Sequence, residues 1–432
     1  MLCISLSPAF EPREYATLLN PLRNNQALIA MESHITRAKL SSEILHLRYG
    51  VDPSSIRVVF APYRICPLGA HIDHQLGAVT AMAIDQGVTL AYVRAPGRKV
   101  RLSSLNFPSE VRFDLDAIDP VQPGDWGNYI RGAAFALAQA GHTLNCGLIG
   151  LVSGRQWSEG GLSSSAAVGV AYLMALEDVN ELEVTPWENI RLDQAIENTY
   201  LGLHNGILDQ SAVVLSHKND LTIINCADAT HELVAPIIEM PPWKIIIAFS
   251  GYQKALTGTA YNKRVAECTE AARILLQAAG RETEKPLLGN VRDSEYAEHQ
   301  DKLPVPLARR AAHFFTEVQR VRHGVEAWKK GDLHKFGRLM TASGESSILN
   351  YECGTGPLID LYHVLGQCEA VYGARFSGAG FRGCCVGLVV PEEAEEASKE
   401  IHHAYTLCQP ELAANASVVV CDSDDGARLL RS

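Results

Sequence analysis

The chain has 432 residues, of which 47% are hydrophobic and 20% charged, so its composition excludes a disordered, collagen-like or coiled-coil protein. At roughly 150 residues per domain, this length predicts two or three domains. The 38 Lys and Arg against 49 Asp and Glu give a formal net charge of −11, which opposes binding to nucleic acid or to an anionic membrane. An anionic ligand therefore needs a local arrangement of hydrogen-bond donors.

Cysteine usage and the N-terminus indicate the compartment. The 11 cysteines include no Cys-x-x-Cys pair, which favours reduced thiols over a disulfide framework or a zinc site. The sequence has neither an unbroken apolar run of about 18 residues nor the features of a signal peptide. We therefore expect a cytoplasmic protein without a membrane partner. Residues 1–30 are either a disordered extension or an upstream start, and the oligomeric state, monomer or dimer, stays open.

The pattern of apolar residues predicts an α+β protein. In chain order we expect a helix over residues 31–50, a strand over 56–61, one or two strands over 79–93 and a helix over 163–180. Further strands are predicted over 221–226, 243–249, 384–390 and 417–421, and further helices over 262–279, 307–330, 357–367 and 391–407. Because strands and helices mix without a strict βα repeat, we predict two α+β domains, over 31–222 and 223–432.

A glycine- and serine-rich loop leads into the helix predicted over 163–180, and its sequence is Gly160-Gly161-Leu162-Ser163-Ser164-Ser165-Ala166. Glycines let a ligand approach the backbone, a helix N-terminus presents unpaired N–H groups, and serine hydroxyls can bind oxygens or a metal. The loop therefore indicates a phosphate site, with an ordinary small-residue helix start as the alternative. It lacks the lysine of a Walker loop, and the His-Arg-Asp and Asp-Phe-Gly motifs of protein kinases are absent from the chain.

A second glycine loop, over residues 377–383, matches Gly-x-Gly-x-x-Gly. A dinucleotide site requires a helix to open within that motif, whereas here a strand is predicted from Cys384. We interpret the loop as a tight turn between strands that approaches another backbone or a phosphate, or that is merely structural.

Two polar segments complete the candidate site. In an extended chain, His71 and Asp73 lie on the same face and suit sugar hydroxyls, with a surface turn or a two-residue metal site as alternatives. Glu197 and Asp209, separated by glycines, can converge on one cleft, where one holds Mg²⁺ and the other accepts a proton. The alternative for this pair is two solvated carboxylates.

Taken in order, these segments resemble the GHMP superfamily of small-molecule kinases, and within it the galactokinase branch, from about residue 56 to the C-terminus. The resemblance rests on Arg-x-x-x-x-Gly-x-His-x-Asp beginning at Arg64, Gly-Leu-Ser-Ser-Ser-Ala beginning at Gly161, and Gly-Ala-Gly-Phe-x-Gly-Cys beginning at Gly378. It implies an N-terminal domain like the second domain of ribosomal protein S5, a ferredoxin-like C-terminal domain, and ATP and a sugar in the cleft between them.

The resemblance also implies roles for individual residues. Ser165 and Glu197 correspond to the residues that bind Mg²⁺, and residues 160–166 correspond to the loop that binds the ATP phosphates. Asp209 corresponds to the carboxylate next to the attacking sugar hydroxyl, and Arg64 to its arginine partner. The positions that fall on sugar contacts are Ala70, His71, Asp73, Gly206 and Tyr261.

One departure from the galactokinase pattern bears on the substrate. Galactokinases have a glutamate directly before the histidine, where it binds the C6 hydroxyl, and this chain has Ala70. Because a glutamate repels a C6 carboxylate, alanine implies a sugar acid. Residues 61–74 and 376–385 closely resemble a plant-type branch that phosphorylates D-galacturonate at its anomeric hydroxyl, giving α-D-galacturonate 1-phosphate and ADP.

The residue that binds the C6 carboxylate stays open at this point. The candidates are His74, Tyr252, Lys263 and Arg264. The alternative functions are a kinase for galactose, glucuronate or arabinose and, from another class, a non-catalytic sugar sensor.

Overall fold

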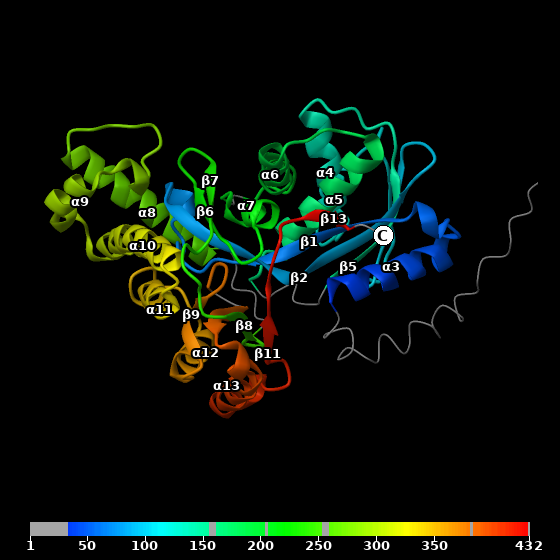
Figure 1. Cartoon of the computed structure of the whole chain (residues 1–432). Helices are drawn as coiled ribbons and strands as arrows, with labels where there is room; N and C mark the ends of the chain where they lie inside the picture. Colours follow the sequence, from blue (N-terminus) through cyan, green and yellow to red (C-terminus); the bar gives the residue numbers. More distant parts are fainter. Residues whose placement is uncertain (1–32, 155–160, 204–205, 253–258, 381–382, 431–432) are drawn as a thin grey trace, which may run out of the picture.

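The computed structural model describes residues 33–154, 161–203, 206–252, 259–380 and 383–430. The extension predicted over residues 1–30 lies outside these ranges. The described chain contains two β-sheets with helices around both (Figure 1). Its ten cysteines carry thiols rather than disulfides, as their spacing predicts.

The first sheet contains nine strands of the described chain, with the main order β13-β1-β2-β5-β3-β4. Their bounds are β1 Arg57–Ile65, β2 Ala78–Arg94, β3 Lys99–Ser104, β4 Val111–Asp114, β5 Leu148–Gly154, β6 Leu221–Asn225, β7 Thr230–Val234, β12 Ser423–Asp424 and β13 Arg428–Leu430. The long strand β2 pairs with β1 and β5, and with β6 over its first four residues. It therefore reaches from one half of the molecule into the other.

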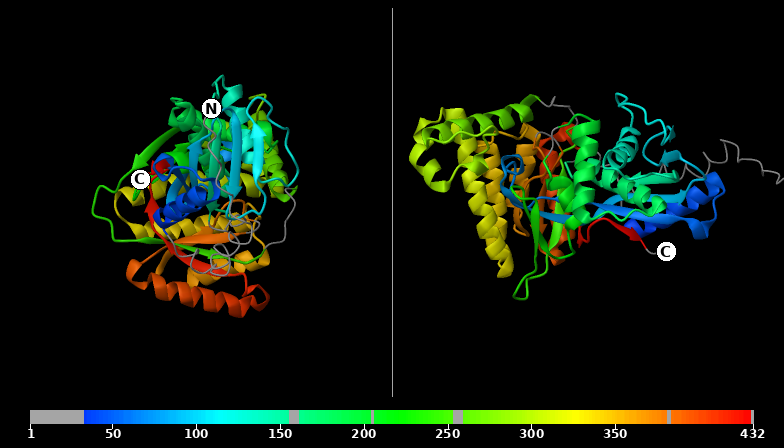
Figure 2. Two further views of the ribbon diagram at one scale, coloured as in Figure 1. Left: turned by 90° about the vertical axis from the view of Figure 1, so that its right-hand side faces the viewer. Right: turned by 90° about the horizontal axis from the view of Figure 1, so that it is seen from above.

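Helices cover both faces of the first sheet (Figures 1 and 2). On β2, Leu90 and Tyr92 pack into the core beneath α4 (Asn128–Gln139) and α5 (Ser164–Asn180), whereas Ala91 and Val93 pack against α3 (His34–Tyr49). This alternation follows from the two-residue period of a strand. The same side of the sheet as α5 carries α6 (Pro186–Ala195), a π-helical turn (Ile196–Tyr200) and α7 (Leu208–Leu215).

The second sheet has the order β11-β8-β10-β9, and all its pairs are antiparallel. Its strands are β8 Lys244–Phe249, β9 Val371–Phe376, β10 Cys384–Val389 and β11 Ser417–Cys421, and the helices of this half are α8 Thr259–Ala278, α9 Asp293–His299, α10 Val305–Lys329, α11 Leu333–Leu349, α12 Gly356–Gln367 and α13 Ala394–Cys408. Ile245 and Ile247 face the core shared with the first sheet, and Ile246 and Ala248 face α12 and α13. Both faces of this sheet are therefore buried.

The C-terminal end of the described chain crosses from the second sheet to the first. After β11 the chain returns to the first sheet, where β12 pairs with β2 and β13 pairs with β1. Strand β6, which spans the predicted boundary at residue 222, pairs with β2, and β7 pairs with β6. The two sheets agree with the predicted α+β class, and the division of the chain at residue 222 stays a prediction.

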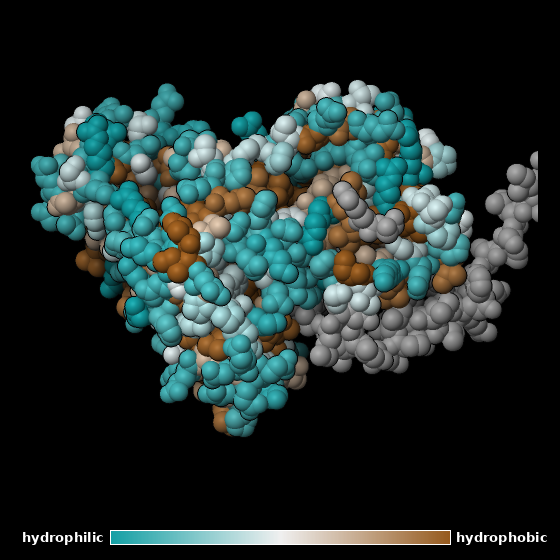
Figure 3. Space-filling model, viewed as in Figure 1, coloured by the Kyte–Doolittle hydropathy of each residue, from teal (hydrophilic) through white to brown (hydrophobic). Residues whose placement is uncertain are grey.

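The molecular surface is mostly polar on the face shown in Figure 3. Within the described chain, no helix combines the length and the apolar character that crossing a bilayer requires.

A buried hydrogen-bonded pair of a carboxyl group and an amide joins α5 to α6. The Asn189 amide donates to both carboxylate oxygens of Glu177, at 3.1 Å each. Burial, reinforced by the charge of Glu188, raises the pKa of Glu177 to about 8. Between that value and its ordinary pKa, folded Glu177 holds a proton that the unfolded chain releases, so this group makes stability fall as pH rises.

We expect Glu177→Gln to stabilise the chain relative to wild type increasingly from pH 5 to pH 8, by at most about 1.4 kcal/mol per pH unit. Melting temperatures of both proteins at several pH values measure this. Glu183→Gln, at an exposed position six residues further along the chain, is the control and gives a stability difference that does not change with pH. A pH-independent difference for Glu177→Gln contradicts the account.

Candidate active site

The glycine- and serine-rich loop ends at the first turn of α5. Gly161 has a φ of 75°, and Ser163, the N-cap, has a φ of 56° and makes no side-chain capping bond. The Ser163 hydroxyl is buried and has no hydrogen-bond partner among the described residues. A buried hydroxyl beside an uncapped helix N-terminus fits a phosphate oxygen. Gly160 lies outside the described residues.

The two glycine loops touch each other. The Ser377 hydroxyl donates to the carbonyl oxygen of Gly161 at 2.9 Å. A Cβ atom on Gly161 would lie 2.7 Å from the carbonyl oxygen of Ser377, and one on Gly378 would lie 3.0 Å from that of Gly161. The loop between β9 and β10 is therefore a turn between strands that approaches another backbone, as predicted.

Arg64 joins the loop to Asp209. Strand β1 shifts register between Pro62 and Arg64, an irregularity of the kind that redirects side chains. The buried Arg64 guanidinium donates from Nε and Nη2 to Oδ1 of Asp209, at 2.9 and 2.7 Å, and from Nη1 to the carbonyl oxygen of Gly161, at 3.1 Å. Asp209 opens α7 and keeps 32% of its side chain exposed, so it faces open space beside the loop.

Acidic side chains gather next to this pair. Glu197 lies in the π-helical turn and is almost fully buried, and Asp193 lies one helical turn before it. Both oxygens of Asp193 are buried without a hydrogen-bond partner among the described residues. Burial, with the charges of Glu197 and Asp209, raises the pKa of Asp193 well above its ordinary value. A cation bound near these carboxyl groups would offset the repulsion between them.

Ser165 and Glu197 also share a neighbour. Burial and the charge of Glu197 raise the pKa of Tyr129, and a hydrogen bond with Ser165 opposes the rise. The described chain contains no group of three or more His, Cys, Asp or Glu residues arranged to hold a metal. One carboxylate and one hydroxyl suit Mg²⁺, which usually keeps several waters and binds substrate phosphates.

The polar segment after β1 differs from the prediction. His71 has a φ of 59° and Asp73 begins a 3₁₀ turn (Asp73–Gln75), so the extended conformation predicted for this segment is wrong. The segment reverses direction tightly to enter β2. The turn nevertheless brings Asp73 against Gly206, where a Cβ atom would lie 2.4 Å from Oδ2 of Asp73.

Aromatic and imidazole rings line the same region. The His71 ring stacks on Tyr351, with centroids 4.2 Å apart and planes 3° from parallel, and the Tyr261 ring meets His74 edge-on at 6.1 Å. His74 Nε2 lies 3.2 Å from the Tyr351 hydroxyl. Burial and the charges of Asp73 and Asp209 raise the pKa of Tyr261, so Tyr261 lies near both carboxylates.

Burial is the main cause of the pKa shifts of His71, Asp73 and His74. Burial raises the pKa of Asp73, and the Asp209 charge adds to the rise while His74 opposes it. Burial lowers the pKa of His74, and it lowers that of His71 well below the ordinary value. The imidazoles are therefore neutral near pH 7 and can both donate and accept.

The four residues that the sequence offers as candidates for binding a C6 carboxylate of the sugar differ in their surroundings. Lys263 is 70% exposed and lies near Glu267, and Arg264 pairs with both Glu267 and Glu352. Tyr252 is half-buried after β8. Only His74, of these four, contacts the ring cluster described above.

Several residues of the site escaped the sequence analysis. Tyr351 follows α11, a helix whose pattern was not detected, so no signal marked it. Asp193 precedes Glu197 by four residues, a spacing that places two carboxylates on one helix face and could have drawn attention. His313 and Glu317 repeat that spacing on α10.

Three family models match the chain: the GHMP kinases N-terminal domain over residues 128–217, the GHMP kinases C-terminal region over 325–407, and the galactokinase galactose-binding signature over 46–94. The signature spans Arg64 to Asp73, and the N-terminal model spans the phosphate loop, Glu197 and Asp209. The chain belongs to the galactokinase branch of the GHMP kinases. Its two α+β halves are the two domains of this kinase fold.

Named relatives of this GHMP kinase are similar over most of their length. It is 50% identical over 404 residues to the galacturonokinase of Arabidopsis thaliana, covering 88% of this chain and 95% of the relative. It is 35% identical over 381 residues to a galactokinase of Roseiflexus sp. (strain RS-1), covering 88% and 93%. The crystal structure of Lactococcus lactis galactokinase complexed with galactose aligns with a TM-score of 0.82 at 30% identity, covering 91% of this chain and 100% of the other.

The contact between the glycine loops predicts that ATP binding is sensitive to a side chain at position 161. We expect Gly161→Ala to lower the affinity for ATP by roughly tenfold or more, because its Cβ pushes the loop away from Ser377. Gly124→Ala is the matched control, since Gly124 has the same φ of 75° but no atom within 4 Å of its Cβ position. Titration with a fluorescent ATP analogue measures both. Equal affinities in the two variants contradict the role of the contact.

Proposed function

We propose that this GHMP kinase transfers the γ-phosphoryl group of MgATP to the anomeric hydroxyl of D-galacturonate, giving α-D-galacturonate 1-phosphate and ADP. The observation that carries the proposal is the bridge that Arg64 makes between Asp209 and the Gly161 carbonyl. It couples a carboxylate to a phosphate loop, which is the arrangement that phosphoryl transfer to an alcohol needs.

In this mechanism Asp209 orients the C1 hydroxyl and accepts its proton, and Arg64 offsets the charge on the carboxylate and the transferring group. The loop from Gly160 to Ala166 binds the phosphates through its backbone and hydroxyls. Ser165 and Glu197 would hold Mg²⁺, which when bound neutralises charge on the β- and γ-phosphates. Most of the acceleration then comes from alignment and charge stabilisation.

The sugar occupies the region between Asp209 and the ring cluster, where Ala70, His71, Asp73, Gly206 and Tyr261 contact it. His74 is the proposed partner of the C6 carboxylate, because it lies in that cluster and can donate from Nε2. Two facts support a sugar acid over a neutral sugar. Ala70 replaces the glutamate of galactokinases, and the relative that is 50% identical is named a galacturonokinase.

The direct test is ADP release from MgATP with D-galacturonate, D-galactose, D-glucuronate and L-arabinose at matched concentrations. We expect a clear preference for D-galacturonate. Preference for galactose would overturn the assignment of D-galacturonate as the substrate. No ADP release with any sugar, despite ATP binding, would favour a non-catalytic sensor.

Asp209→Ala tests the proton acceptor. We expect turnover to fall by about 10²–10⁴-fold, with a much smaller change in the sugar dissociation constant, because positioned acid–base groups contribute on that scale. Steady-state kinetics and calorimetric sugar binding separate the two effects. Asp228→Ala, at an exposed turn, is the control. Near-normal turnover of Asp209→Ala rejects the assignment.

Ala70→Glu tests the basis of specificity. We expect the ratio of kcat/KM for D-galacturonate to that for D-galactose to fall by roughly tenfold or more, because two like charges meet in the cleft. Ala70→Gln adds the same bulk without the charge and separates repulsion from crowding, since Ala70 is 3% exposed. An unchanged ratio in Ala70→Glu refutes the argument.

A further inference from the structure

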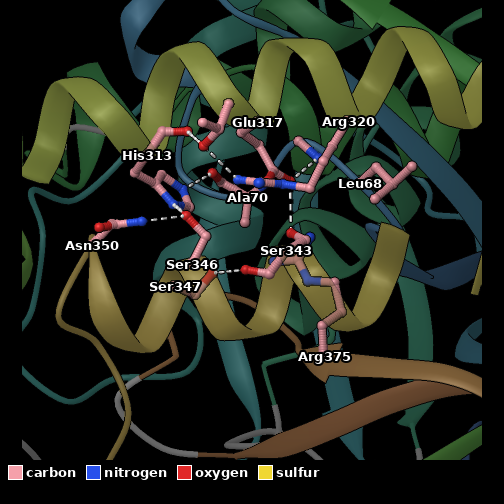
Figure 4. A network of polar contacts seen from close by, with 12 residues as sticks. Leu68, Ala70, His313, Glu317, Arg320, Ser343, Ser346, Ser347, Asn350 and Arg375 are labelled. Atoms are coloured by element: carbon pink, nitrogen blue, oxygen red, sulfur yellow. Dashed lines mark hydrogen bonds and ion pairs between the residues drawn. The ribbon is translucent and has the colours of Figure 1, made fainter. Parts of the chain in front are cut away.

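A buried polar network lies between α10, α11 and the segment that carries Ala70 (Figure 4). It contains a carboxylate, an imidazole and serine hydroxyls that the proposed phosphoryl transfer does not use. Its two central side chains, His313 and Glu317, are four residues apart on one face of α10 and are buried. Both belong to the C-terminal half of the chain, whereas Ala70 belongs to the N-terminal half.

Glu317 binds two consecutive backbone N–H groups. Its Oε1 accepts from the N–H of Gly69 at 2.7 Å, from the N–H of Ala70 at 3.1 Å and from the Ser343 hydroxyl at 2.6 Å. Its Oε2 accepts from Nε of Arg320 at 2.5 Å. Burial favours a raised pKa, but the charges of Arg320, His313 and Arg375 and the Ser343 bond outweigh it and lower the pKa of Glu317 to about 2. The carboxylate is therefore ionised and fully engaged.

His313 binds the other side of the same residue. Its Nε2 lies 2.8 Å from the Ala70 carbonyl oxygen, and its Nδ1 lies 2.9 Å from the Ser346 hydroxyl. Burial lowers the pKa of His313 to about 4, so the ring is neutral. Because a carbonyl only accepts, the proton is on Nε2, and Nδ1 accepts from Ser346.

These contacts hold Ala70 by both its N–H and its carbonyl. The next residue, His71, has a φ of 59°, a left-handed conformation that costs free energy for a residue with a side chain. Such a conformation persists when its surroundings determine it, and the buried Arg375 adds to this by donating to the Cys66 carbonyl at 2.9 Å. The positions of Ala70 and His71 therefore depend on side chains of the opposite half.

We propose that His313 and Glu317 are positioning residues of the sugar site, which hold the backbone of Gly69 and Ala70 in place and thereby set the geometry of His71 and Asp73. The sugar-site part of this inference rests on the proposed function. Neither side chain is a ligand of the sugar, because each is already bonded to the backbone behind the segment. Loss of either weakens sugar binding without weakening ATP binding.

Glu317→Gln is the first test. A carboxylate accepts hydrogen bonds at both oxygens, whereas the Gln side chain has an oxygen on one side and an NH₂ group on the other. That NH₂ group must face either the donors of Gly69, Ala70 and Ser343 or the donor of Arg320. We expect the sugar KM to rise by roughly tenfold or more while the KM for ATP stays within about twofold. The assay uses whichever sugar the unaltered chain phosphorylates fastest, so a wrong substrate assignment is detected before any variant is compared.

Amide hydrogen exchange without sugar provides a readout that is independent of activity. We expect the peptide over residues 66–72 to exchange roughly tenfold faster in Glu317→Gln than in the unaltered chain. The control is Trp328→Phe, at a buried position about three turns further along α10. It lowers the melting temperature without changing the sugar KM or the exchange of that peptide.

His313 gives a second pair of variants if Glu317→Gln does not fold. His313→Leu removes the donor to the Ala70 carbonyl, and His313→Gln can restore it. We expect the sugar KM to rise in the first variant and to return most of the way in the second. Unchanged sugar KM and unchanged exchange over residues 66–72 in these variants, or equal losses of sugar and ATP affinity, overturn the proposal.

Discussion

The arrangement of this active site depends on one buried guanidinium. Arg64 enters the site from β1 and makes three hydrogen bonds, two to the Asp209 carboxylate at the start of α7 and one to the Gly161 carbonyl before α5. A planar guanidinium makes such bonds in fixed directions, so the relative positions of a strand, a loop and a helix are determined together. The proposed proton acceptor and the proposed phosphate loop are consequently parts of one unit.

Around this unit, both halves of the chain contribute residues to the one site. The turn between β9 and β10 comes from the C-terminal half and packs backbone to backbone on the phosphate loop. Helix α10, also from the C-terminal half, binds the backbone beside Ala70. Conversely, β2 extends from the first sheet into the core of the C-terminal half, where its residues Val79 and Ala81 are buried. A site shared in this way is sensitive to changes in either half.

About half of the helices and strands of the described chain, and the functional segments, were predictable from local sequence signals. The period-two and period-3.6 apolar patterns predicted α5, β8, α10 and β10 close to their observed bounds, whereas β1 continues four residues past its predicted end at residue 61. The conformation of residues 69–75 was not predictable, because a left-handed His71 is stabilised by contacts with residues more than 240 positions away. For the same reason Tyr351 and Glu317 were missed, since only the folded chain brings them to the sugar segment. Short edge strands such as β12 and β13 also depend on distant pairing rather than on local pattern.

The central claim is that Asp209, held by Arg64, directs phosphoryl transfer to the anomeric oxygen of a sugar acid. Phosphorus-31 NMR of the product made from D-galacturonate labelled with carbon-13 at C1 tests it most directly. The account predicts a phosphorus signal split by coupling to the labelled carbon, with the α configuration at C1. A product whose phosphorus shows no coupling to C1, with phosphate on another hydroxyl or on the carboxylate, would contradict it.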